Sequence, residues 1–161
     1  MLDNNVETVF TYRSYSPQDT EQLAAAIAAV STAGLVIGLD GDLGAGKTAF
    51  SQGYARHLGV RDIVSSPTFT IIKEYEGRLP LYHMDVYRIS FQEADELGLD
   101  EYFYGQGVCL VEWSSIIQEL MPPRHMHIHM ETTGLDERII TVTGIGEPYG
   151  ELCRDLSQKW G

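Results

Sequence analysis

The chain has 161 residues, of which 43% are hydrophobic, and a formal net charge of -12 at pH 7. This length and apolar content suffice for one buried core, so we expect residues 1–161 to form a single domain. No apolar run reaches the roughly 18 to 20 residues that span a bilayer, and the first ten residues lack the features of a secretory signal. We therefore expect a cytoplasmic protein without membrane contact. The acidic charge repels nucleic acid, so a role in its metabolism would require another molecule to hold the RNA or DNA.

The first half of the chain alternates strand and helix patterns. Residues 6–12 alternate as a strand does, and Ser16-Pro17 is typical of the start of a helix, which we expect from about 17 to 31. The run LVIGLD at 35–40 predicts a short core strand. A glycine-rich loop follows it, and then a helix from about 47 to 58 that Gly59 ends.

The second half of the chain has the patterns of a hairpin and of further strands and helices. The runs FTIIKEY and LPLYHMDVY flank residues 76–78 and predict a hairpin. The remaining expected elements are a short helix in FQEADELG, a buried strand in VCLVE, a helix in SSIIQEL, strands in HMHIHME and RIITVTG, and a last helix near 148–159. Interleaved strands and helices indicate an α/β fold, which we predict to be a three-layer sandwich. The glycine-rich loop GDLGAGKT at residues 41–48, between a strand and a helix, predicts that this sandwich is of the P-loop NTPase type. Its central sheet is expected to be mostly parallel, with antiparallel additions.

The loop after the strand LVIGLD matches the phosphate-binding pattern G-x-x-x-x-G-K-[ST]. Glycine allows the backbone to approach phosphate oxygens closely enough for its N–H groups to bind them. The residues expected to bind the nucleotide here are Gly41, Asp42, Leu43, Gly44, Ala45, Gly46, Lys47 and Thr48. Lys47 would contact the β and γ phosphates, Thr48 would offer its hydroxyl to Mg²⁺, and the next helix would direct its positive end at the same anion. The alternative is a glycine-rich turn with a solvated lysine.

Two acids follow apolar strand patterns and are candidates for the catalytic carboxylates. Glu112 ends VCLVE, where a magnesium-binding acid is expected in a P-loop enzyme. Asp85 follows LYHM and is either a second magnesium contact or the residue that orients the attacking water. The alternatives are an ordinary solvated acid for Glu112 and a turn or capping role for Asp85.

Three further patterns carry weaker signals. The hydroxyls and the proline of SSPTFT are compatible with a switch that senses the γ phosphate, comprising Ser66, Pro67, Thr68, Phe69 and Thr70, although a plain turn would look the same. His125, His127 and His129 alternate on one strand face, and we interpret them as a solvated face in preference to a metal site. The guanine-reading N-K-x-D pattern is absent from the sequence, which favours ATP over GTP.

Four segments in this order, GDLGAGKT, SSPTFTIIKEY, LYHMDVYR and LVEWSSII, resemble the TsaE (YjeE) family. These are small P-loop ATPases of bacterial tRNA threonylcarbamoyladenosine biosynthesis, and the likeness runs from about residue 20 to 144. The resemblance implies an ATPase that joins TsaD-type and TsaB-type partners in modifying the adenosine beside the anticodon, with tRNA held only through those partners. ATP hydrolysis would drive or reset the complex.

By matching position, the resemblance implies roles for single residues. Thr48 and Glu112 correspond to magnesium ligands, and Lys47 with the loop amides corresponds to the phosphate cradle. Asp85 corresponds to the residue that supports hydrolysis, and Trp113 to a neighbour of the nucleotide.

Two other functions remain open from the sequence. A P-loop domain of this size could be a small-molecule kinase, although no arginine-rich insertion that would form a lid separates the strands. It could also be a nucleotide-gated binding module in which hydrolysis is slow and the conformation of the switch sets partner affinity.

Overall fold

The computed structural model describes residues 6–42, 45–64 and 72–160. In this part of the chain, the strands are β1 (Glu7–Ser14), β2 (Val36–Gly41), β3 (Ile72–Tyr75), β4 (Leu81–Asp85), β5 (Val108–Glu112), β6 (His125–Thr132) and β7 (Arg138–Ile145). The helices are α1 (Pro17–Ala29), α2 (Lys47–His57), α3 (Phe91–Glu96), α4 (Asp100–Phe103), the 3-10 helix η1 (Ser114–Leu120) and α5 (Tyr149–Trp160).

All these strands form one sheet in the order β1-β7-β6-β2-β5-β4-β3. The four central strands, β6, β2, β5 and β4, are parallel to one another. Strands β1 and β7 add to one side and β3 to the other in antiparallel pairings. The predicted α/β class, with a parallel centre and antiparallel additions, is therefore confirmed.

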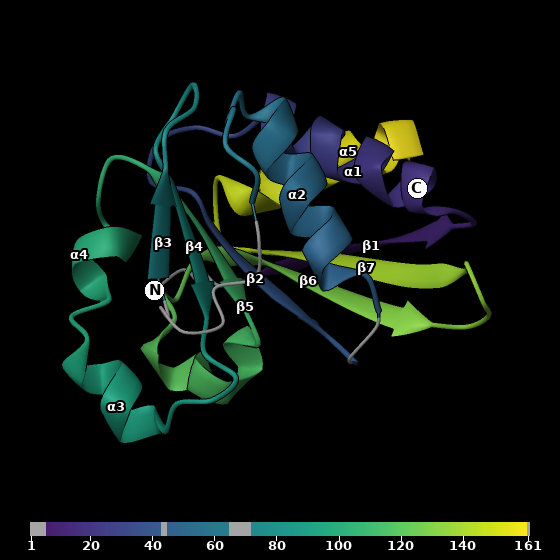
Figure 1. The fold of residues 1–161 in the computed structure, drawn as a ribbon. Helices are drawn as coiled ribbons and strands as arrows, with labels where there is room; N and C mark the ends of the chain where they lie inside the picture. The colour runs from purple at the N-terminus through teal and green to yellow at the C-terminus, as the bar shows by residue number, and fades with distance from the viewer. Residues whose placement is uncertain (1–5, 43–44, 65–71, 161) are drawn as a thin grey trace.

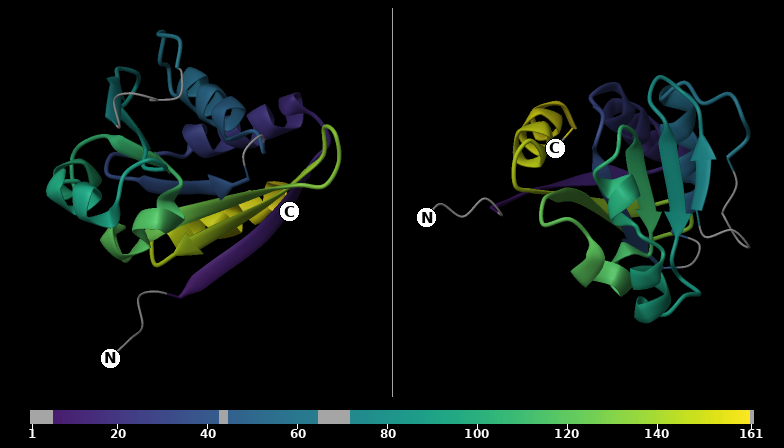
Figure 2. Two further views of the ribbon diagram at one scale, coloured as in Figure 1. Left: turned by 60° about the horizontal axis from the view of Figure 1, so that its bottom comes forward. Right: turned by 90° about the vertical axis from the view of Figure 1, so that its left-hand side faces the viewer.

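Helices cover the sheet on both sides (Figure 1). Helices α1, α2 and α5 share one apolar core with the sheet, to which Leu23, Ile27, Phe50 and Tyr54 contribute fully buried side chains. A second core on the opposite face includes side chains from α3, α4 and η1. The helices of this second layer lie under β2, β5 and β4, and the same face of β1, β7 and β6 stays open (Figure 2, left).

Two local features differ from the sequence-based expectation. Helix α4 was not predicted, because it is a single turn that is fixed mainly by burial of Phe103. The predicted helix in SSIIQEL is a 3-10 helix, in which Ile117 departs from helical geometry with φ -116° and ψ 33°. Trp113, which precedes η1, has a left-handed backbone with φ 65°. The residue that begins this segment therefore lies outside the right-handed helical region.

The topology brings distant segments together at one edge of the sheet. Strand β2 lies between β5 and β6 although neither is its neighbour in sequence. Because parallel strands end at the same edge, the loop after β2 lies beside the ends of β4 and β5, and this edge is where α/β sheets bind ligands. In the described ranges no helix is long and apolar enough to cross a membrane.

Candidate functional site

The loop after β2 leads directly into α2, and Lys47 is the first residue of that helix. Gly46 caps the helix with φ 98°, a left-handed conformation that favours glycine. The Lys47 ammonium donates hydrogen bonds to the carbonyl oxygens of Gly41 at 2.5 Å and Asp42 at 2.9 Å. The lysine is thus curled back into its own loop and is only 6% exposed. The predicted contacts Leu43 and Gly44 lie outside the described residues.

The start of α2 has the features of an anion site. The N-cap Gly46 provides no side-chain hydrogen bond, and the first turn carries no acid. The first N–H groups of a helix have no partner within it, and the helix dipole makes this end positive. Thr48 is exposed in the same turn, so its hydroxyl is accessible from solvent beside these N–H groups.

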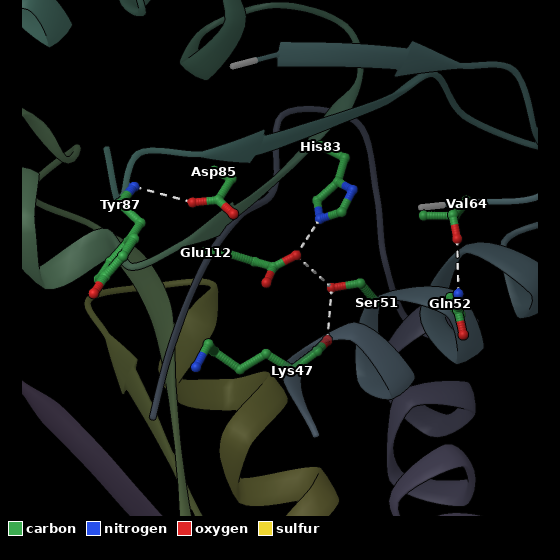
Figure 3. A network of polar contacts seen from close by, with 8 residues as sticks. All are labelled: Lys47, Ser51, Gln52, Val64, His83, Asp85, Tyr87 and Glu112. Carbon is green, nitrogen blue, oxygen red and sulfur yellow. Dashed lines mark hydrogen bonds and ion pairs between the residues drawn. The ribbon is translucent and has the colours of Figure 1, made fainter. Parts of the chain in front are cut away.

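Glu112 occupies the centre of a buried polar network (Figure 3). The carboxylate is 3% exposed, and its Oε2 atom lies 2.5 Å from His83 Nε2. The Ser51 hydroxyl donates to Lys47 O at 2.9 Å and also lies 3.4 Å from Glu112 Oε2. His83 is 1% exposed and its Nδ1 atom has no hydrogen-bond partner in the structure. Glu112 is therefore a buried, oriented carboxylate, which disagrees with the alternative of an ordinary solvated acid.

Asp85 lies directly beside Glu112 in the sheet. The two residues are in register on the parallel strands β4 and β5, so both carboxylates leave the sheet at the same edge. Asp85 Oδ1 accepts a hydrogen bond from the Tyr87 backbone N–H at 3.0 Å, and Figure 3 shows both acids on the side of the sheet where Lys47 lies. The structure thus brings together the acids that the sequence placed in separate motifs, and Asp85 also fills the turn role.

The Lys47 ammonium lies in an acidic environment. Burial lowers the pKa of Lys47 below its ordinary value, and the charges of Glu112, Asp40, Asp42 and Asp85 oppose that shift. These carboxylates surround the only lysine near the loop, since the other two are Lys73 and Lys159. A polyanionic ligand at this site would therefore need a further cation to offset the repulsion.

Aromatic rings cover the lysine. The Lys47 Nζ atom lies 4.0 Å from the centre of the Trp113 ring, well within the range of a cation–π contact. The Trp113 ring packs in turn on Tyr87, with 4.6 Å between ring centres. Trp113 thus lies beside the loop, and its ring contacts the lysine itself; its role as a neighbour of the nucleotide, which the resemblance implies, stays a prediction.

A second buried acid, Asp40, was missed by the sequence analysis. It accepts hydrogen bonds from the Ser114 hydroxyl at 2.6 Å, from the Ser115 hydroxyl at 2.9 Å and from the Ser115 backbone N–H at 3.1 Å. His127 Nε2 lies 2.7 Å from its Oδ2 atom. The His127 side chain is nevertheless 32% exposed and His129 is exposed, so the interpretation of the three histidines as a solvated face holds for His129 and in part for His127. In the described residues no group of three or more histidine, cysteine and acidic side chains is arranged to hold a metal ion.

These contacts determine how Asp40 titrates. Burial alone would raise its pKa, but the hydrogen bonds from His127, Ser114 and Ser115 outweigh burial and lower the pKa from 3.8 to about 2. A pKa that is lower in the folded than in the unfolded chain contributes stability above pH 3.8, and this contribution disappears as the pH falls through about 2. The shift corresponds to about 2 kcal/mol.

Asp40→Asn should accordingly change the pH dependence of folding. We expect the difference in unfolding free energy between wild type and this variant to be about 2 kcal/mol smaller at pH 2 than at pH 7. Urea unfolding at both pH values, followed by circular dichroism, measures it. A difference that stays constant with pH would contradict the ionised state that the contacts assign to Asp40.

The predicted switch, Ser66 to Thr70, lies outside the described residues. The segment that leads to it is attached to α2, because Gln52 Nε2 donates to the Val64 carbonyl at 2.8 Å (Figure 3). Val64 is the last described residue before that segment. Val64, just before the predicted switch, is therefore hydrogen-bonded to the same helix that carries Lys47 and Thr48.

A small cavity of about 60 Å³ adjoins the described part of the loop. Its lining residues are Ser16, Pro17, Thr20, Ala45, Gly46, Ala49, Asp136 and Arg138. The Arg138 guanidinium donates from Nε to the Ala45 carbonyl at 2.9 Å. The loop is thereby connected to the start of β7, so this cavity lies on the side of the loop away from Glu112's strand.

Comparisons with known proteins agree with one another. A family model described as threonylcarbamoyl adenosine biosynthesis protein TsaE matches residues 14–140. The tRNA threonylcarbamoyladenosine biosynthesis protein TsaE of Bacillus subtilis (strain 168) is 53% identical over 148 residues, which cover 91% of this chain and 93% of the relative. The protein of the same name from Treponema pallidum (strain Nichols) is 40% identical and covers 80% of this chain. The crystal structure of Bacillus subtilis YdiB is similar with a TM-score of 0.84 and 48% identity, and it covers 96% of this chain and 97% of that one.

Proposed function

Because the chain belongs to the TsaE family, we propose that it is a magnesium-dependent ATPase of tRNA threonylcarbamoyladenosine biosynthesis. In this role it acts with TsaD-type and TsaB-type partners on the adenosine next to the anticodon. ATP hydrolysis drives or resets the complex and does not transfer the carbamoyl group. The curated relatives carry the name of this pathway, and the resemblance of the motifs favours the same partners.

One observation carries the ATPase part of the proposal. The loop brings a buried lysine at the first residue of α2 into the field of two carboxylates, Glu112 and Asp85, that end adjacent parallel strands. The loop backbone and the helix start supply N–H groups for phosphate, and Lys47 supplies the positive charge. The strand ends supply the acids that phosphoryl transfer to water requires. A solvated turn lysine would need neither burial nor these neighbours.

The residues present fit a magnesium ion. The Thr48 hydroxyl and the Glu112 carboxylate would hold it, because both are hard oxygen ligands of the kind that Mg²⁺ prefers. When bound, the ion neutralises charge that develops on the transferred phosphoryl group. The acidic surroundings of Lys47 are a reason why ATP would bind as its magnesium complex.

The remaining side chains have defined parts in this proposal. Lys47 leaves the Gly41 and Asp42 carbonyls and turns to the β and γ phosphates. His83 and Ser51 hold the Glu112 carboxylate in one orientation, since both contact Oε2. Asp85 accepts a hydrogen bond from the attacking water and so orients it. His83 is a positioning residue that the sequence analysis did not assign.

We propose that the ribose and base extend over the loop on the side of Ala45 and Gly46, where the cavity of about 60 Å³ hollows the surface but is too small to enclose them. It adjoins the loop residues that would bind the phosphates. Arg138 contacts the Ala45 carbonyl there and presents a planar guanidinium on which a base could stack. The cavity lies beside Ala45 and Gly46, the last two residues of the loop before α2 begins at Lys47.

The acidic surface agrees with a division of labour between subunits. A net charge of -12 disfavours direct contact with tRNA phosphates. The partners would supply the basic tRNA-binding surface, and this chain would supply the nucleotide site. The switch segment that follows Val64 is our candidate for relaying the nucleotide state to them.

Replacement of the relative in Bacillus subtilis tests the whole proposal. In cells depleted of their own TsaE, which is 53% identical to this chain, the wild-type chain should restore N6-threonylcarbamoyladenosine in tRNA. The Lys47→Ala variant, expressed at the same level, should not. Mass spectrometry of tRNA nucleosides measures the modification. Equal restoration by both proteins would contradict a role for the phosphate loop in the pathway.

A further inference from the structure

Trp113 is held in an unfavourable backbone conformation. It is the only residue other than glycine with a positive φ among those the structure describes, at 65°. For a bulky side chain such a conformation is strained, and it persists only where surrounding contacts enforce it. Its ring lies over Lys47, so the conformation places an aromatic surface directly on the proposed phosphate-binding lysine.

The contacts that enforce this conformation come from two consecutive residues of β2. The Trp113 backbone N–H donates to the Leu39 carbonyl at 2.8 Å. The next residue of the strand, Asp40, binds the hydroxyls of Ser114 and Ser115 and the backbone N–H of Ser115. Residues on both sides of the Trp113 peptide are therefore fixed to the strand that leads into the phosphate loop.

Space for this arrangement comes from Gly38. A Cβ atom at this position would lie 2.9 Å from the Ser114 Cβ, too close for the start of η1 to keep its place. With glycine there, Ser114 reaches over the strand and donates to Asp40 Oδ2. Three consecutive residues of β2 thus have separate roles. Gly38 leaves room for Ser114, the Leu39 carbonyl accepts from the Trp113 N–H, and Asp40 accepts from the Ser114 hydroxyl.

The hydrogen bonds at Asp40 suit a carboxylate. Each serine group that faces it donates a hydrogen bond, and a carboxylate accepts hydrogen bonds without donating any. His127 adds a further contact at Oδ2 from β6. An asparagine could keep its Oδ1 on the Ser115 N–H and hydroxyl, but its NH₂ group would replace the acceptor Oδ2, so Ser114 and His127 would have to change from donors to acceptors.

We propose that Asp40 is a positioning residue that holds Trp113 over Lys47 and so shapes the nucleotide site. Among the described residues its side-chain hydrogen bonds go to Ser114, Ser115 and His127, and none goes to Lys47. It acts through Ser114 and Ser115, and His127 braces it from the neighbouring strand. The consequence for nucleotide binding rests on the proposed function, whereas the placement of Trp113 does not.

The placement is measurable without nucleotide, because the chain has only two tryptophans. In a Trp160→Phe background, Trp113 is the sole source of tryptophan fluorescence. Asp40→Asn should shift the Trp113 emission to longer wavelength and increase its quenching by acrylamide, since the ring would leave its packed position. Glu131→Gln is the matched control, an acid-to-amide change at an exposed position of β6, and it should change neither property.

A milder variant keeps the test decisive if Asp40→Asn does not fold. Ser115→Ala removes one hydroxyl and leaves the backbone N–H to Asp40 in place. It should shift the emission in the same direction by a smaller amount, at a temperature well below the melting transition. Unchanged emission and quenching in folded Asp40→Asn, or in Ser115→Ala if the former does not fold, would overturn the positioning role.

The effect of Asp40 on nucleotide binding is tested by a separate measurement of ATP affinity. ATP affinity in the presence of Mg²⁺ should fall about tenfold in Asp40→Asn if Trp113 is then in place in about one molecule in ten, because only that fraction is competent to bind. If the wild type binds no ATP, the proposed function fails while the fluorescence result still decides the role of Asp40. If the wild type binds ATP and the variant binds it equally well, the inference fails and the proposed function stands.

Discussion

Lys47→Ala should lose about 100-fold in ATP affinity. The ammonium is the one cationic side chain that the structure places within the loop, where it contacts the carbonyls of Gly41 and Asp42. Redirected to the phosphates, it would make two charge-assisted hydrogen bonds, each of which contributes about 1.5 to 3 kcal/mol. Titration calorimetry of ATP with Mg²⁺ into both proteins measures the change.

Lys159→Ala provides the control for this substitution. Lys159 is exposed in the last turn of α5, and its removal changes the net charge of the protein by the same amount. ATP affinity should be unaffected in that variant. If the Lys47→Ala protein folds and binds ATP like the wild type, the proposal that this loop binds the phosphates of ATP is wrong.

Glu112→Gln should reduce hydrolysis by about 100-fold or more, in the range expected for loss of a catalytic acid–base or metal-binding carboxylate. Its ATP affinity should change much less, because the loop and Lys47 are intact. Glutamine keeps an acceptor for His83, which lies 2.5 Å from the carboxylate. Single-turnover hydrolysis with saturating ATP, compared with the binding constant, separates the two effects.

Alanine at the same position is the less informative variant. Glu112→Ala would leave His83 buried at 1% exposure with neither ring nitrogen paired, since Nδ1 already lacks a partner. It should therefore lose stability as well as turnover.

Glu74→Gln, the same change at an exposed acid on β3, serves as the control for Glu112→Gln. Normal hydrolysis by Glu112→Gln would contradict the role assigned to Glu112.

The parts of the site that follow short local patterns could be predicted from the sequence. The glycine spacing of the loop needs only consecutive residues, and it placed Lys47 at the start of a helix, as observed. Glu112 and Asp85 were identified as acids that end apolar runs, and their register in the sheet shows that they are neighbours. The chemical roles of these residues stay predictions.

The supporting residues could not be predicted, because their contacts depend on strand order. Asp40 meets Ser114 and His127 only because β2 lies between β5 and β6, and no local pattern contains that information. His83 carried a usable signal, since it lies two residues before Asp85 and so shares its face of the strand. A buried histidine beside a strand-end acid would then have been the natural expectation.

We propose that the loop at residues 41–48 hydrolyses ATP under the control of partner proteins. The most direct measurement is the ATP hydrolysis rate of the purified chain, alone and then with TsaD-type and TsaB-type partners, with Lys47→Ala as the control. The proposal requires low activity alone and strong stimulation by the partners, abolished in Lys47→Ala. Hydrolysis that the partners leave unchanged, especially together with phosphorylation of a small metabolite, would contradict it and favour the kinase alternative.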